Sequence, residues 1–136
     1  MRGFIGEGGV GGVVHVESFW GYDLDSSFGR ALLADRSHWV HELPGKLFGN
    51  VIDHAVSKIC EFLPDEQPRV LAHGYTLRPE RFGDERDLLQ DELRVILAGA
   101  RVSAYATFSS HIRPAGQFVR VYGTRNTVAV DYIART

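Results

Sequence analysis

Apolar residues recur every three to four positions between residues 45 and 63, in a stretch that follows Pro44 and stops before Pro64. This spacing predicts one long α-helix. The apolar positions are Leu47, Phe48, Val51, Ile52, Ala55, Val56, Ile59, Cys60, Phe62 and Leu63. At about 100° per residue they cover a broader arc than a surface helix needs, so we expect a mostly buried helix.

A narrow polar strip remains on this predicted helix. It comprises Lys46, Asn50, Asp53, His54, Ser57 and Glu61. Asn50 and His54 are one turn apart at the border with the apolar arc, so their side chains should share one edge. We expect that edge to form the wall of a cleft.

The rest of the chain is dominated by the two-residue alternation of β-strands. Predicted strands cover residues 13–20, 69–77, 93–97, 102–109, 118–122 and 128–132, with turns at 99, 114–116 and 123–126. One face of the 102–109 strand is apolar. The other face is semi-polar and fits either a solvated surface or a dimer surface. The order of elements predicts an α+β fold, a mostly antiparallel open-faced sheet with helices packed on one face.

Glycines near the N-terminus match a G-x-G-x-x-G spacing at Gly6, Gly8 and Gly11. A nucleotide loop with this spacing needs a strand before it and a helix after it. Here only five residues precede Gly6 and a strand follows. We therefore expect a short helix at residues 2–7, stopped by glycine.

The connection at residues 21–43 is predicted to be irregular, apart from a short helix at 28–34 capped by Ser26 or Ser27. Such long connections tend to be functional, and we expect this one to fold over the head of the long helix.

Two imidazoles and an indole crowd together at His38, Trp39 and His41. His38 and His41 with His54 could form a three-imidazole zinc site, or they could hydrogen-bond locally and line a substrate cleft. Because no carboxylate or thiolate lies in register, we favour a cleft without metal. Trp39 could stack on a sugar ring or fill the core.

Composition narrows the class of protein. The 136 residues suit a single domain over 1–136, and a net charge of -2 with interspersed signs argues against a nucleic-acid partner. No apolar run approaches the ~20 residues of a membrane span, and no signal-peptide core follows Met1. The single Cys60 falls in the apolar arc, so we expect a buried thiol and a cytoplasmic location. The charge run 84–87 is predicted to be a solvated loop.

Three phrases of the chain resemble the C-terminal domain of the Gfo/Idh/MocA oxidoreductases, the family of glucose-fructose oxidoreductase and inositol dehydrogenase. Gly45, Leu47, Asn50, Ile52 and His54 fall in the register of the family's helix phrase of glycine pair, leucine, aspartate, glycine and histidine. Residues 5–16 look like its crossover helix end and first sheet strand, and residues 119–131 look like its late hairpin.

The resemblance implies roles for residues of the long helix and the preceding loop. His54 corresponds to the family's catalytic histidine, which acts with a lysine on a sugar or polyol hydroxyl while hydride passes to NAD or NADP. Asn50, Lys46, His38, His41 and Trp39 are the candidate substrate-binding residues. The sequence departs from the family at Asn50, Ile52 and Ser57, where an aspartate, a glycine and an acid are usual. An amide cannot relay a proton as a carboxylate does, but it can hydrogen-bond a hydroxyl.

The family's nucleotide-binding domain and its catalytic lysine have no counterpart in these residues, so we expect no cofactor in this chain and no activity from it alone. Two functions remain open. The first is the substrate-binding and oligomerisation domain of an NAD(P)-dependent oxidoreductase acting on a sugar- or polyol-like substrate. The second is a stand-alone dimeric α+β binding or scaffold module without catalytic activity. Both predict a homo-oligomer formed through the open face of the sheet.

Overall fold

The computed structural model describes residues 2–35, 37–44, 46–63, 67–81 and 91–133. The elements in chain order are α1 (Arg2–Gly6), β1 (Val13–Asp23), α2 (Ser27–Ala34), η1 (Trp39–His41), α3 (Lys46–Cys60), β2 (Arg69–Tyr75), η2 (Pro79–Arg81), β3 (Glu92–Ala98), β4 (Ser103–Ser109), β5 (His111–Gly123) and β6 (Thr127–Asp131). The charge run at 84–87 lies outside the described residues. No helix within those residues is long and apolar enough to cross a membrane.

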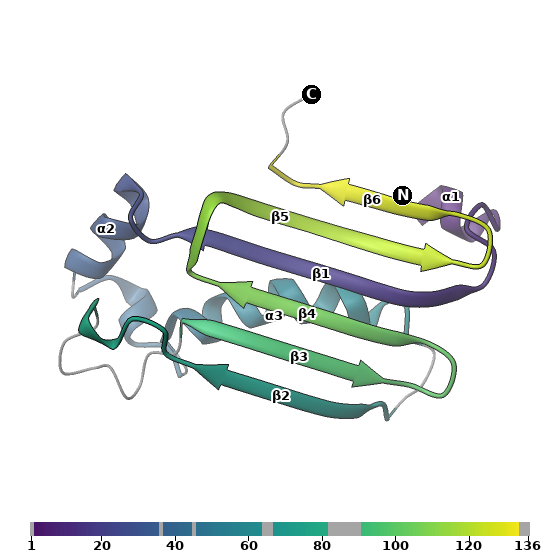
Figure 1. Cartoon of the computed structure of the whole chain (residues 1–136). Helices are drawn as coiled ribbons and strands as arrows, with labels where there is room; N and C mark the ends of the chain where they lie inside the picture. The colour runs from purple at the N-terminus through teal and green to yellow at the C-terminus, as the bar shows by residue number, and fades with distance from the viewer. Residues whose placement is uncertain (1, 36, 45, 64–66, 82–90, 134–136) are drawn as a thin grey trace.

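The strands form one six-stranded sheet in the order β2-β3-β4-β1-β5-β6 (Figure 1). β1 lies in the interior of the sheet, where it pairs in parallel with β4 and antiparallel with β5. The other three pairings are antiparallel. The predicted α+β fold with a mostly antiparallel open-faced sheet is therefore confirmed.

β4 and β5 follow each other in the chain but lie on opposite sides of β1 in the sheet, so the chain passes around the carboxyl end of β1 as it goes from β4 to β5. The pairs Gly21–Gly116 and Asp23–His111 leave one residue of β1 opposite four of β5, at a register shift. These extra residues bulge out of the ladder and let β5 bend around the end of its partner. The turn that we predicted at residues 114–116 is thus wrong, because these residues lie inside a longer strand.

The N-terminal glycines end a helix and introduce β1, as predicted. Gly8 and Gly11 adopt positive φ angles of 79° and 75°, a conformation that glycine accepts without steric cost. β1 continues through Asp23, so the irregular connection that we expected from residue 21 begins three residues later.

Helix α3 lies behind the sheet in Figure 1 and packs on β1 and β4. Val51, Ala55 and Ile59 point into a core that includes Val16 and Phe108. This buried stripe is narrower than the predicted arc because Ile52 and Val56 are only half-buried. The expectation of a buried Cys60 is wrong: the thiol-bearing residue is exposed, since it follows Ile59 by about 100° around the helix.

Candidate functional site

His54 lies on the exposed flank of α3 and stacks against an aromatic residue of β1. Its ring is 5.4 Å from that of Trp20, with the two planes 20° apart. The indole N–H of Trp20 donates a hydrogen bond of 3.2 Å to the Ser18 hydroxyl. The Trp20 ring also stacks on that of Tyr132, with 6.1 Å between the ring centroids. The stack fixes the imidazole at the surface while leaving its ring nitrogens without hydrogen-bond partners in the described part of the chain.

Asn50 and Lys46 lie on the same helix, Asn50 one turn before His54 and Lys46 at the first helical position. The backbone thus places Asn50 and His54 in the i, i+4 relation that the sequence predicted. The side chains of Asn50 and Lys46 lie outside the described residues, so their roles stay predictions.

A hollow of about 460 Å³ opens between α2, η1 and the end of β1, and we call it the α2 hollow. Its lining comprises Tyr22, Asp23, Leu24, Ser26, Phe28, Gly29, Leu32, His38, Trp39, Val40, Val51 and Ala115. Ser26 caps α2, as predicted, because its hydroxyl accepts the Gly29 N–H at 3.1 Å. Burial raises the pKa of the Tyr22 phenol, and a hydrogen bond with Gln117 acts in the opposite direction.

His38, the N-cap of η1, and His41, its last residue, are engaged locally. His38 accepts the Val40 N–H through Nδ1 at 3.3 Å, and Nε2 of His41 lies 3.1 Å from the Leu32 carbonyl oxygen. η1 packs against α3, as predicted for this connection. Among the described residues the one group of three potential metal ligands is elsewhere, so the structure does not support the three-imidazole alternative.

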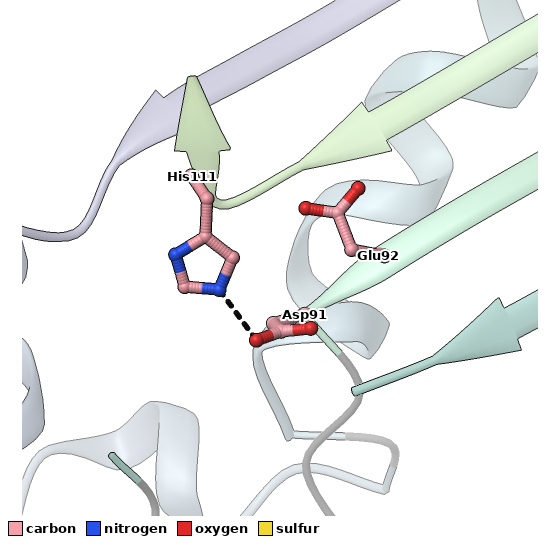
Figure 2. A group of neighbouring side chains, drawn as sticks. All are labelled: Asp91, Glu92 and His111. Atoms are coloured by element: carbon pink, nitrogen blue, oxygen red, sulfur yellow. Dashed lines mark hydrogen bonds and ion pairs between the residues drawn. The ribbon is translucent and has the colours of Figure 1, made fainter. Parts of the chain in front are cut away.

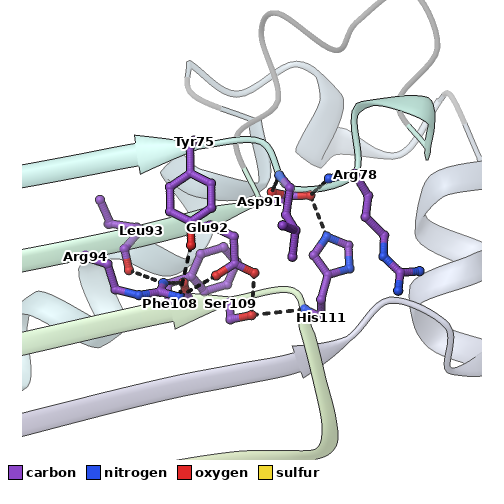
Figure 3. A network of polar contacts seen from close by, with 10 residues as sticks. Tyr75, Arg78, Asp91, Glu92, Leu93, Arg94, Phe108, Ser109 and His111 are labelled. Carbon is purple, nitrogen blue, oxygen red and sulfur yellow. Dashed lines mark hydrogen bonds and ion pairs between the residues drawn. The ribbon is translucent and has the colours of Figure 1, made fainter.

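That group is Asp91, Glu92 and His111, where β3 and β5 begin (Figure 2). Asp91 is completely buried and its Oδ2 lies 2.5 Å from His111 Nε2. The same carboxylate accepts the Leu77 N–H at 2.7 Å and the Arg78 N–H at 3.2 Å (Figure 3). Asp91 thus joins the segment after β2 to the start of β5.

Glu92 continues the network on the open face of the sheet (Figure 3). It accepts the Ser109 hydroxyl at 2.5 Å and Nη2 of Arg94 at 2.8 Å. Arg94 also donates through Nη1 to the Phe108 carbonyl oxygen at 2.8 Å. Both carboxylates are therefore already occupied by protein donors, and a metal ion would have to displace Arg94, Ser109 and the Asp91–His111 contact.

Sequence reasoning missed this network. The alternation of the strand does place Glu92 and Arg94 on one face, a signal that was available. The pairing of Asp91 with His111 spans 20 positions and depends on the course of β5 around β1, which no local pattern shows.

The open face of the sheet carries aromatic and charged groups on its β1–β5 half. Phe19 and Phe118 stack at 5.0 Å, and the Arg120 guanidinium lies over the Phe118 ring at 4.3 Å. On the β2–β3 half, Leu71 and Ile96 are 67% and 44% exposed. The face thus combines exposed apolar side chains with ordered polar ones, a composition typical of interfaces.

The sheet order and the long helix on one face define an α+β domain, with the His54 imidazole exposed on the flank of α3. No protein-family model and no curated protein matches the sequence. Solved structures do share the fold. A myo-inositol dehydrogenase from Corynebacterium glutamicum matches with a TM-score of 0.65 and 15% identity, over 99% of this chain and 37% of that one.

Two further matches were solved with ligands. An inositol dehydrogenase homologue from Azotobacter vinelandii, complexed with NADH and myo-inositol, has a TM-score of 0.63 and 19% identity over 94% of this chain and 32% of that chain. The WlbA dehydrogenase from Bordetella pertussis, in complex with NADH and UDP-GlcNAcA, has a TM-score of 0.71 and 18% identity over 98% of this chain and 36% of that chain. The predicted resemblance is confirmed at the level of the fold, and the chain spans about a third of the length of these dehydrogenases.

Proposed function

We propose that this chain is the substrate-binding and oligomerisation domain of an NAD(P)-dependent oxidoreductase of the Gfo/Idh/MocA family, acting on a sugar- or polyol-like substrate. The observation that carries the proposal is the fold shared over nearly the whole chain with dehydrogenases solved with NADH and with myo-inositol or UDP-GlcNAcA. His54 also falls at the position of the family's catalytic histidine, and Asn50 at the position where the family usually has an aspartate.

His54 is the group that exchanges a proton with the substrate hydroxyl. An imidazole can both accept and donate a proton through its ring nitrogens, which suits it to general acid–base work. Its stacking on Trp20 fixes the ring plane, and among the described residues no hydrogen bond occupies the ring nitrogens. Asn50, one turn away, supplies a hydrogen bond to a neighbouring hydroxyl and takes no part in proton transfer.

The nicotinamide would be bound by the family's nucleotide-binding domain, which has no counterpart in these residues. NAD or NADP bound there would supply the hydride acceptor, and His54 would receive the proton of the reacting hydroxyl. This chain contributes the orientation of the polyol and the proton acceptor. Oligomerisation through the open face of the sheet would fix the position of α3 relative to the nucleotide-binding domain.

The direct test is a titration of the chain with myo-inositol, followed by the ring proton resonances of its histidines. We expect His54 to shift on binding, and His54→Ala to weaken binding at least tenfold. The matched control is His73→Ala, because His73 is an exposed histidine on β2 that stacks on Tyr75, far from α3. NADH should not bind the chain alone. Equal losses for the two variants, or no shift of His54, would contradict the assignment.

A further inference from the structure

The α2 hollow has few free hydrogen-bonding groups in its wall, although polar residues contribute to it. The Ser26 hydroxyl is used by the cap of α2, and Nδ1 of His38 accepts the Val40 N–H. Both carboxylate oxygens of Asp23 are taken by Arg113, at 2.9 Å each. A bare polyol placed here would replace only some of its hydrogen bonds to water, and each hydroxyl left without a partner is unfavourable.

Apolar side chains form the remainder of the wall. Leu24, Leu32 and Val40 are buried and make a packed floor, with exposed fractions of 3%, 7% and 2%. At the rim, Phe28 and Trp39 are 68% and 54% exposed. Large aromatic rings around a concave apolar floor are typical of sites that bind the ring of a ligand. The volume of about 460 Å³ is within the range of small-molecule sites.

The hollow adjoins the proposed acid–base group. Val51 of α3 belongs to its wall, directly after Asn50 and three residues before His54. Residues three apart on a helix are surface neighbours with Cβ atoms about 5–6 Å apart, so the His54 position adjoins this part of the wall. A hydroxyl at His54 and an apolar group in the hollow are then parts of the same molecule.

We propose that the α2 hollow binds an aromatic or alicyclic ring attached to the sugar or polyol. The substrate class is then a glycoside whose aglycone carries such a ring, or a polyol ether whose ether group does. This inference rests on the proposed function, and it narrows the substrate from any polyol to one with an apolar substituent. Trp39 is the residue that discriminates, because its exposed indole can cover the ring at the rim.

The test compares phenyl β-D-glucopyranoside with methyl β-D-glucopyranoside on the 136-residue chain, by calorimetry or tryptophan fluorescence. Burial of the phenyl ring should make the first ligand bind about thirty-fold more tightly, which is about 2 kcal/mol. Trp39→Ala should remove most of this advantage, so that the two glucosides bind with nearly equal affinity. Ala115→Leu, a substitution at an exposed position of the lining, should reduce it as well by filling the space.

Phe4→Ala is the matched control, because Phe4 is an aromatic residue, 48% exposed, on α1 at the opposite end of the sheet (Figure 1). It should leave the phenyl advantage intact. If both glucosides bind equally and His54 shifts with each, the inference is overturned while the proposed function stands. If benzyl alcohol binds in a Trp39-dependent way but neither methyl glucoside nor myo-inositol binds, the hollow is an apolar site and the polyol function fails. Absence of binding by every probe would overturn both.

Discussion

Replacement of Asp91 by alanine should destabilise the fold more than any exposed carboxylate variant. The buried carboxylate accepts two backbone N–H groups, from Leu77 and Arg78, and contacts the His111 ring. Asp91→Ala leaves these two N–H groups and the His111 ring nitrogen without their acceptor, so they must hydrogen-bond to water instead. Each unsatisfied buried donor costs about 1–3 kcal/mol, and we use the lower end because Leu77 and Arg78 are exposed residues. The expected loss is about 3 kcal/mol.

Thermal unfolding measures this loss. For 136 residues an unfolding entropy of about 2.1 cal/mol/K per residue converts 3 kcal/mol into a fall in Tm of roughly 10 °C. Asp53→Ala is the control, because Asp53 is exposed on α3 and such surface changes stay within about 0.5 kcal/mol. A Tm for Asp91→Ala equal to that of Asp53→Ala would refute the structural role. A rise in the wild-type Tm on adding zinc, reversed by a chelator, would show instead that the cluster of Asp91, Glu92 and His111 holds a metal.

Two further predictions concern the end of β1 and the open face of the sheet. Hydrogen bonds from Arg113 lower the pKa of Asp23, so this pair stabilises the fold above the ordinary aspartate pKa and the contribution is lost as pH falls through the lowered value. Denaturant unfolding from neutral to acidic pH should therefore show a smaller acid loss for Arg113→Ala than for the wild type; identical profiles would exclude the effect. Ile96→Lys should convert the oligomer to monomer in sedimentation at micromolar concentration, because a charge on the sheet's open face must be desolvated in the interface. A wild-type chain that is already monomeric would contradict the interface itself.

Local patterns predicted the elements whose determinants lie close together in the chain. The 3.6-residue period marks α3, and Ser26 marks the start of α2 through a hydroxyl that reaches only three residues ahead. The β3–β4 pair and the β5–β6 hairpin follow from alternation and turn residues. Each of these features is decided by sterics and hydrogen bonds within a few residues.

Features that depend on distant partners were not predicted. The periodicity of α3 could not show which side of the helix the sheet would leave uncovered, so Cys60 was assigned to the core although it is exposed. The wide bulge of β5 exists because the strand must pass around β1. The Asp91–His111 contact is a product of that same path. Candidate residues on one helix were thus predictable, whereas the hollow and the polar network required the tertiary structure.

The interior position of β1 has a consequence for how the protein is made. This strand leaves the ribosome well before both of its partners, β4 and β5, because the other helices, β2 and β3 lie between them in the chain. At a synthesis rate of about 5–20 residues per second, β1 waits several seconds for residues 103–123 with both of its edges unpaired. Contacts of such large sequence separation also form slowly. The centre of the sheet therefore forms only after β2 and β3 have been synthesised, and the nascent chain is most open to chaperones or to misassociation during that interval.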